Sequence, residues 1–270
     1  MNYDEQLKQE LIRLADVYGT KNYGNAYAHP NELKNSSVIF NDISYSFQKD
    51  SWNAISGNSS YSTRTNKIHP NTQTKVPALF EMQSSNSSDA LAMNIFCHPS
   101  FKNWKGITNL FQVGNITSIE FGFQAKVLKT NQDQVTEDNT EVDVLINKNI
   151  IAECKLAEAD FCVKDKHVVE QYSEFKNVFH TNLLKQSPTH YDNYQLIRNI
   201  LAANQHNAQF VLICDMRRPD LAQRFLRTVT CIKDDYLNLR TNCRIIYWQD
   251  LAKVVGEDLR KFLDEKYGIS

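Results

Sequence analysis

The chain has 270 residues, 41% of them hydrophobic and 23% charged, with a net charge of −1 at pH 7. It is long enough for one sizeable core with room for an appended subdomain, and its charge excludes a protein that coats nucleic acid through a global basic field. The six cysteines form no Cys-x-x-Cys pair, the N-terminus lacks the apolar core of a signal peptide, and no run reaches membrane-spanning length. We therefore expect reduced thiols, a cytoplasmic location and no membrane partner.

The first element is predicted to be an amphipathic helix over residues 4–18, because Leu7, Leu11, Leu14 and Tyr18 follow a spacing of three to four. A long polar region follows, over residues 20–77. It either wraps the core with short strands and turns or forms a mobile binding arm. We expect residues 1–79 to form a helix and an irregular N-terminal extension, and residues 80–270 to form the main core.

The core begins with a predicted helix over residues 80–96, for which Ser84–Ser88 supply N-cap candidates. Alternation of apolar and polar residues predicts a strand over 116–128, and a polar loop is expected at 131–139. Further helices are predicted over 166–184, 191–204, 219–229 and 251–267, and further strands over 210–214 and 244–248. This order predicts an α/β fold with a mixed central β-sheet flanked by helices.

Two short β-branched runs, residues 140–146 and 150–156, are separated by a turn-like tripeptide and predict a hairpin that carries charged residues. In-register side chains on adjacent antiparallel strands lie about 5 Å apart at Cβ, so Asp143 and Glu153 are expected to come close together. Lys155 lies two residues after Glu153 and is expected on the same face. The backbone carbonyl of Cys154 lies between them, while the Cys154 thiol is expected to face the core.

Three charges on one face of an otherwise apolar hairpin indicate a functional site, because unpaired buried charge is costly. The alternative is a solvent-exposed cross-strand ion pair. Magnesium takes one or two protein carboxylates and keeps several waters, so Asp143, Glu153 and the Cys154 carbonyl form a candidate Mg²⁺ site, with Mn²⁺ expected to substitute. Such an ion activates water and relieves charge at a phosphodiester, with Lys155 orienting or deprotonating the water or offsetting charge on the phosphate.

Asp143 followed by Glu153-Cys154-Lys155 resembles the PD-(D/E)XK, or restriction-endonuclease-like, nuclease superfamily, although Val142 stands where the motif has proline. The segments 84–96 and 194–199 are similar to a prokaryotic group of predicted restriction-endonuclease-like proteins. The resemblance implies a restriction-endonuclease-like core and a magnesium-dependent endonuclease that acts on double-stranded DNA in restriction or defence. Cutting of both strands by one small site favours a homodimer.

The resemblance also implies that an acidic residue upstream of the hairpin completes the metal site. Glu120 is one candidate for this catalytic and metal-binding position, and the others are Glu81 and Glu141; each is otherwise a surface charge. In some relatives a glutamine on the helix after the lysine strand touches the site. This makes Gln171 a further catalytic candidate, although it can equally be an ordinary exposed helix residue.

Basic residues outside the hairpin are candidate phosphate ligands or ordinary solvated charges. One group, near the predicted helix over 219–229, comprises Arg217, Arg218, Arg224 and Arg227, with Lys185 and Arg198 as possible additions. A second group mixes aromatic and basic residues in the N-terminal region, where it can stack on nucleic acid or serve as a structural wrap: Trp52, Tyr61, Arg64 and Lys67.

Two other functions are compatible with the same residues. One is a catalytically inactive DNA-binding protein that keeps the nuclease fold, which an intact Asp/Glu/Lys set disfavours. The other is an RNA-directed or nucleotide-activated immune nuclease, for which the sequence shows no separate sensing domain.

Overall fold

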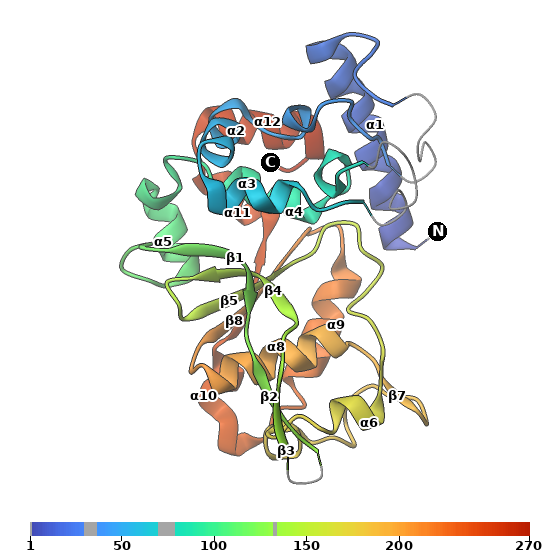
Figure 1. Ribbon diagram of the computed structural model, residues 1–270, viewed down its shortest axis with the longest axis vertical. Helices are drawn as coiled ribbons and strands as arrows, with labels where there is room; N and C mark the ends of the chain where they lie inside the picture. Colours follow the sequence, from blue (N-terminus) through green and yellow to red (C-terminus); the bar gives the residue numbers. More distant parts are fainter. Residues whose placement is uncertain (1, 30–36, 70–78, 132–133) are drawn as a thin grey trace.

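The structure is a computed structural model that describes residues 2–29, 37–69, 79–131 and 134–270. At its centre is a five-stranded mixed sheet in the order β1-β4-β5-β8-β9 (Figure 1). Strands β1 (Ile119–Gln124), β4 (Glu141–Ile146) and β5 (Ile150–Cys154) form an antiparallel meander, and β8 (Gln209–Cys214) and β9 (Cys243–Tyr247) continue it in parallel with β5. The predicted α/β class with a mixed central sheet is confirmed.

Helices cover both faces of the sheet, which explains why β5 is buried along its whole length. One face packs against α8 (Tyr194–Gln205) and α9 (Pro219–Val229). We call this the α8 layer. The other face packs against helices from both ends of the chain and is called the α4 layer: α1 (Tyr3–Tyr23), α4 (Ser88–Phe96), α5 (Lys105–Phe111), α11 (Trp248–Val254) and α12 (Glu257–Tyr267).

The N-terminal region is more regular than its composition predicts. Helix α1 continues past Gly19 to Tyr23 and is capped by Gly24. Gly24 has a left-handed φ of 74°, and its backbone amide donates a hydrogen bond to the Thr20 carbonyl (3.1 Å). The region also contains a 3-10 turn η1 (Ile43–Ser46) and two short helices, α2 (Lys49–Ser56) and α3 (Ser59–Thr65). Both helices begin at polar N-cap side chains, a local signal that the aliphatic periodicity does not register. The parts of this region at 30–36 and 70–78 lie outside the described residues.

Helix α1 belongs to the main core rather than to an isolated extension. Leu7, Leu11, Ala15 and Tyr18 pack in the same cluster as residues of β4, β5 and α12. The division between residues 79 and 80 stays a prediction of the sequence. In the described residues, no helix is both long and apolar enough to cross a membrane. All six cysteines are free thiols.

The predicted helix over 80–96 is instead a 3-10 turn η3 (Glu81–Gln83) followed by α4, whose N-cap Ser87 accepts the Ala90 amide at 3.1 Å. The strand predicted over 116–128 ends at Gln124. Lys126 has a left-handed φ of 49°, and the chain then forms a second hairpin from β2 (Val127–Asn131) and β3 (Gln134–Asp138). The polar loop expected at 131–139 is therefore wrong for the described part of that segment.

The helix predicted over 166–184 is also wrong. Only α6 (Lys166–Val169) and α7 (Phe175–Val178) are helical, because the intervening backbone bonds to β2: Thr130 donates to the Gln171 carbonyl (2.7 Å) and Ser173 to the Leu128 carbonyl (3.0 Å). The predicted last helix is divided at Val255, whose extended ψ of 166° separates α11 from α12. The remaining short elements are η4 (Phe101–Asn103), β6 (Lys164–Asp165), β7 (His190–Tyr191), η5 (Asp234–Tyr236) and α10 (Leu237–Thr241).

Candidate active site

The candidate site lies where β4 and β5 separate. Their ladder pairs Val144 with Ala152, so the next step along both strands places Asp143 opposite Glu153. At Asp143 the regular alternation of β4 breaks, since Val142 packs in the α8 layer and Val144 in the α4 layer. The Asp143 carboxylate projects into the gap, and its Oδ2 accepts the Cys154 amide at 2.7 Å. A side-chain oxygen thus takes the amide that a regular ladder would give to a backbone carbonyl.

Glu153 and Lys155 lie on one face of β5, as their spacing predicts. They are 2% and 6% exposed, and Lys155 Nζ lies 3.1 Å from Glu153 Oε1. Cys154, between them, is buried in the core of the α4 layer. The Lys155 backbone is fixed on both sides, because its amide donates to the Ile213 carbonyl (2.8 Å) and its carbonyl accepts the Trp248 indole N–H (2.9 Å).

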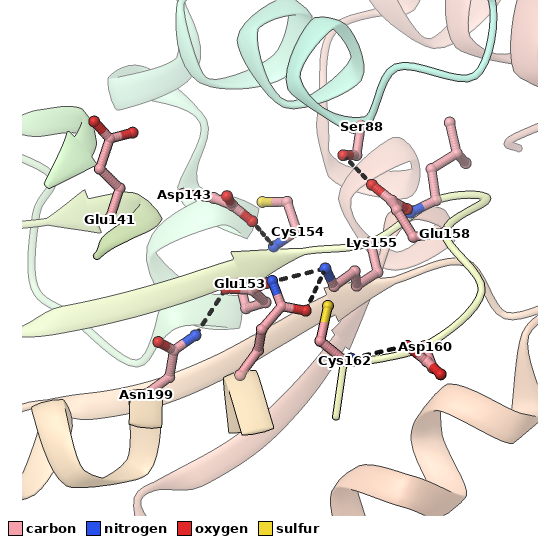
Figure 2. A network of polar contacts seen from close by, with 12 residues as sticks. Ser88, Glu141, Asp143, Glu153, Cys154, Lys155, Glu158, Asp160, Cys162 and Asn199 are labelled. Carbon is pink, nitrogen blue, oxygen red and sulfur yellow. Dashed lines mark hydrogen bonds and ion pairs between the residues drawn. The ribbon is translucent and has the colours of Figure 1, made fainter. Parts of the chain in front are cut away.

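Helix α8 supplies three polar partners, of which the sequence singled out only Arg198, as a candidate phosphate ligand. Asn199, fully buried, donates to Glu153 Oε2 at 2.7 Å, as Figure 2 shows. Gln195 accepts a hydrogen bond from Lys155 Nζ at 3.0 Å. Arg198 donates to Asn199 Oδ1 (2.6 Å) and to the Glu141 carbonyl (2.8 Å) and so ties α8 to β4. The i, i+4 spacing of Gln195 and Asn199 is the signal that places both on one helix face.

Helix α4 brings a further carboxylate, Asp89, close enough for its charge to act on Asp143. This residue lies in the first turn of α4, where the helix dipole favours a carboxylate. It is 7% exposed, and its Oδ1 accepts a hydrogen bond from Arg64 Nη2 at 3.0 Å. Its Oδ2 is buried and accepts no hydrogen bond from the described residues, with Lys67 Nζ 3.6 Å away.

The three acids predicted for the upstream position are not among the groups whose charge acts on Asp143. Glu120 is exposed on β1 and lines a separate hollow of about 260 Å³. Glu81 pairs with Lys67 at 2.9 Å. The Glu141 side chain is 56% exposed and lies 3.6 Å from Arg64 Nη1.

Gln171 lies in a turn after α6, where its backbone carbonyl accepts the Thr130 amide. It is not on the long helix that was expected there. The glutamine that contacts Lys155 is Gln195, from α8. The expected type of side chain is thus present, but it comes from a helix further along the chain.

The charges in the site act strongly on one another. Burial, Glu153 and Asp89 together raise the pKa of Asp143 well above its usual range, against the opposing effects of Lys155 and the Cys154 amide. Burial alone would lower the pKa of Lys155. The neighbouring carboxylates of Glu153, Glu158 and Asp143 outweigh burial and raise that pKa above its ordinary value, so Lys155 is an ammonium at neutral pH.

Glu158 is held at the edge of the site from two directions. Its Oε2 accepts the Leu156 amide at 2.7 Å, and its Oε1 accepts a hydrogen bond from the Ser88 hydroxyl at the start of α4 (Figure 2). This pairing links the end of β5 to the helix that carries Asp89.

The donor set fits a hard divalent cation. Burial and the neighbouring charges of Glu153 and Asp89 raise the pKa of Asp143, and Asp89 keeps a buried oxygen without a hydrogen bond from the described residues. A cation would offset the excess negative charge and give that oxygen a partner. Among the residues that the structure describes, no three His, Cys, Asp or Glu side chains gather into a complete ligand cluster. Magnesium needs only one or two carboxylates. Asp143 and Glu153 provide these, and the strand pairing directs the Cys154 carbonyl to the same side as its amide.

Two of the arginines predicted as phosphate ligands near α9 serve the fold. Arg218 is fully buried and donates to the Glu158 carbonyl (2.7 Å) and to Asp220 (2.8 Å). Arg217 forms ion pairs with Asp215 (2.6 Å) and Glu10 (2.9 Å). Both guanidiniums therefore brace loops of the protein.

The aromatic residues of the N-terminal group also pack internally. Trp52 stacks on Phe47 with ring centroids 5.2 Å apart, and Tyr61 meets Phe121 edge-on at 5.6 Å. For the aromatic side chains, these contacts support the interpretation of that region as a structural wrap. Its two cations differ, because Arg64 and Lys67 reach Asp89.

Comparison with known proteins gives one match. The sequence model of the family described as "Restriction Endonuclease associating with ARP" matches residues 18–268. No curated protein and no solved structure matches the chain. The matched range includes the β4–β5 hairpin together with α3, α4 and α8, which surround it. The chain therefore belongs to this restriction-endonuclease-like family, Restriction Endonuclease associating with ARP.

Proposed function

We propose that the protein is a magnesium-dependent endonuclease that hydrolyses phosphodiester bonds in double-stranded DNA, in restriction or defence. The observation that carries this proposal is the meeting of Asp143, Glu153 and Lys155 at the separating ends of β4 and β5. Membership of a restriction-endonuclease-like family supports the same chemistry.

In this proposal Asp143, Glu153 and the Cys154 carbonyl hold the ion, and Asp89 takes the upstream position first expected for Glu120. Bound Mg²⁺ supplies an activated water and relieves charge on the phosphate. Lys155, held beside Glu153, would orient or deprotonate the water or offset charge on the phosphate.

Two residues of α8 position these groups. Asn199 fixes one Glu153 oxygen, and Gln195 fixes the Lys155 ammonium. Hydrogen-bond partners of this kind orient the groups that contact ion and substrate, and their loss lowers metal affinity or activity.

Cleavage of supercoiled plasmid tests the proposal. We expect the wild-type protein to cut in Mg²⁺ or Mn²⁺ and not in EDTA. Asp143→Asn and Lys155→Met should each lose at least about a hundredfold in rate, a loss of the size found when one group that stabilises the transition state is removed. Equal cleavage by all three proteins would remove the assignment, and no cleavage by folded wild-type protein would favour an inactive DNA-binding role.

The choice between upstream acids has a matched control. Asp89→Asn should lower the cleavage rate, while Glu120→Gln, an equivalent change on the neighbouring exposed strand, should leave it near that of the wild type. The opposite result would restore Glu120 to the site.

One site of this size cuts one strand, so we propose that a homodimer makes the double-strand break. Light scattering after gel filtration, with and without duplex DNA, measures the mass. Linear product that appears without a nicked intermediate should accompany a dimer, whereas a strictly monomeric protein that only nicks would contradict this part of the proposal.

A further inference from the structure

A groove of about 390 Å³ opens between α3 and β1, beside Asp89. Its walls carry two cations, Arg64 and Lys67, and the hydroxyl-bearing residues Ser60 and Thr63, against a single carboxylate, Glu141. This lining suits an anion of modest size, since cations and hydroxyl groups are the usual partners of phosphate oxygens.

Arg64 is placed in the groove with hydrogen-bonding capacity to spare. Its side chain is 13% exposed, and its Nη2 lies 3.0 Å from Asp89 Oδ1, but its buried Nε has no hydrogen-bond acceptor among the described residues. Its second contact is loose, with Nη1 lying 3.6 Å from the exposed Glu141 carboxylate. A phosphate oxygen in the groove would give Nη1 a closer acceptor than Glu141 provides.

The backbone of β1 is shaped to admit this guanidinium. Gly122 has a left-handed φ of 65°, and a Cβ built on it would lie 2.6 Å from Arg64 Nη1 and 3.0 Å from Glu141 Oε2. Any other residue would strain the strand and displace the arginine. Gly122 lies opposite the position of Asp143 in the register of β1 and β4, and the charge of Asp143 acts on Arg64, so the groove lies next to the candidate active site.

The charges also indicate when the groove can take a phosphate. Asp89, Glu81 and Glu141 engage the two cations in the structure. A divalent cation bound at the site would compensate the charge of Asp89, the carboxylate that Arg64 and Lys67 share, and weaken its hold on both.

We propose that the groove between α3 and β1 is a binding site for a backbone phosphate of the nucleic-acid strand, held by Arg64 and Lys67, and that it acts together with a divalent cation at the neighbouring carboxylates. This proposal rests on the proposed function, because it takes the strand to be the substrate. It gives the N-terminal helices a role in holding DNA next to the hairpin.

The test measures binding of a short duplex DNA over a series of salt concentrations, in Ca²⁺ and in EDTA, for wild-type protein and two variants. Each phosphate contact contributes about 0.9 to the slope of log affinity against log salt concentration. In Ca²⁺ we expect Arg64→Gln and Lys67→Gln each to bind more weakly and to reduce that slope by about 1. In EDTA the differences should shrink.

Two further variants make the experiment specific. Lys253→Gln changes a cation of similar exposure (60% against 54% for Lys67) on the helix that follows β9, at the opposite edge of the sheet, and should bind like wild type. Arg64→Lys keeps the charge and should retain most of the slope, which separates loss of a contact from loss of folding. Thermal unfolding of every variant confirms that it is folded.

The outcomes separate this proposal from the proposed function. If the wild type cleaves plasmid but Arg64→Gln and Lys67→Gln bind with its affinity and slope, the groove is not a strand site and the nuclease assignment stands. If the two variants show the reduced slope while the wild type does not cleave, the groove proposal stands without the activity. If Arg64→Gln alters stabilisation by inorganic phosphate but not DNA binding, the groove serves a free anion and the proposal is overturned.

Discussion

The hydrogen bond from Asn199 to Glu153 gives a quantitative prediction about metal affinity. Asn199 is fully buried on α8, and its side-chain amide donates to Glu153 Oε2 at 2.7 Å. Its own oxygen is fixed by Arg198, through Nη2 at 2.6 Å and Nε at 3.0 Å. Asn199→Ala removes both connections, so the Glu153 carboxylate can rotate away from the orientation in which it faces the gap at Asp143.

The size of the effect can be worked out in two ways. A hydrogen bond to a charged group contributes about 1.5–3 kcal/mol. Removal of a group that orients a metal ligand typically lowers metal affinity by about 10- to 100-fold, which corresponds to about 1.4–2.7 kcal/mol. The two ranges agree, so we expect Asn199→Ala to weaken Mg²⁺ or Mn²⁺ binding by about 10- to 100-fold. The variant should also lose stability, because the buried Arg198 keeps the Glu141 carbonyl but loses its side-chain acceptor.

Calorimetric titration with Mn²⁺, well below the unfolding temperature, measures the affinity directly. Asn94→Ala is the matched control: Asn94 is equally buried, on α4, and its amide donates to the Ser46 and Ala90 carbonyls at 3.0 and 2.7 Å. It should lower the unfolding temperature and leave the Mn²⁺ affinity unchanged. Wild-type affinity in Asn199→Ala, or an equal loss in both variants, would refute the orienting role.

Three further predictions concern stability. Lys266 is buried against aromatic rings and donates to the Ser46 carbonyl at 2.8 Å, and burial lowers its pKa well below the ordinary value. The unfolded chain therefore binds one more proton than the folded protein, and the free energy of unfolding should rise with pH up to the ordinary lysine pKa. Lys266→Met should add about 1–3 kcal/mol to the free energy of unfolding at pH 7 and remove its rise with pH, as measured by denaturant titrations. Burial would raise the pKa of Asp138, but hydrogen bonds from Thr140, Tyr172 and Lys129 outweigh burial and hold the pKa below the usual range. The stabilisation of the folded state by the ionised Asp138 is therefore complete above about pH 4 and is lost on acidification through the folded-state pKa. Asp138→Asn should cost about 2–3 kcal/mol at pH 7 and less in acid, and an unchanged difference across pH would contradict the assignment. Gly122→Ala should lower the free energy of unfolding by about 1–3 kcal/mol, because Gly122 has a left-handed φ. Thermal unfolding measures the loss, with Gly114→Ala as the control, since a Cβ added at Gly114 meets nothing within 4 Å.

The hairpin could be predicted from sequence because its geometry depends on residues that are close together in the chain. Side chains alternate along a strand, so Glu153 and Lys155 share a face in any regular β5, and the turn between the two runs sets Asp143 opposite Glu153. Helix α9 was likewise predicted with its observed bounds, because Pro219 fixes its first turn.

The partners of the hairpin could not be predicted in the same way. Asp89 lies 54 residues before Asp143, and Asn199 lies 46 residues after Glu153. Only the packing of α4 and α8 brings them close to these groups. Gln171 was expected beside Lys155 because a continuous helix was expected after the lysine strand. Backbone bonds to β2 end that helix early, and Gln195 takes the position.

The separating end of β4 and β5 is where both helical layers can reach the same groups. Elsewhere the sheet keeps the layers apart, since β5 is buried on both faces by apolar side chains. At Asp143 the alternation of β4 changes face and its carboxylate occupies the gap. Asn199 of α8 holds Glu153 from one layer (Figure 2), and the charge of Asp89 on α4 acts on Asp143 from the other. The break in the strand thus lets charges from both layers, Asp89 on one side and Glu153 on the other, act on the single carboxylate of Asp143.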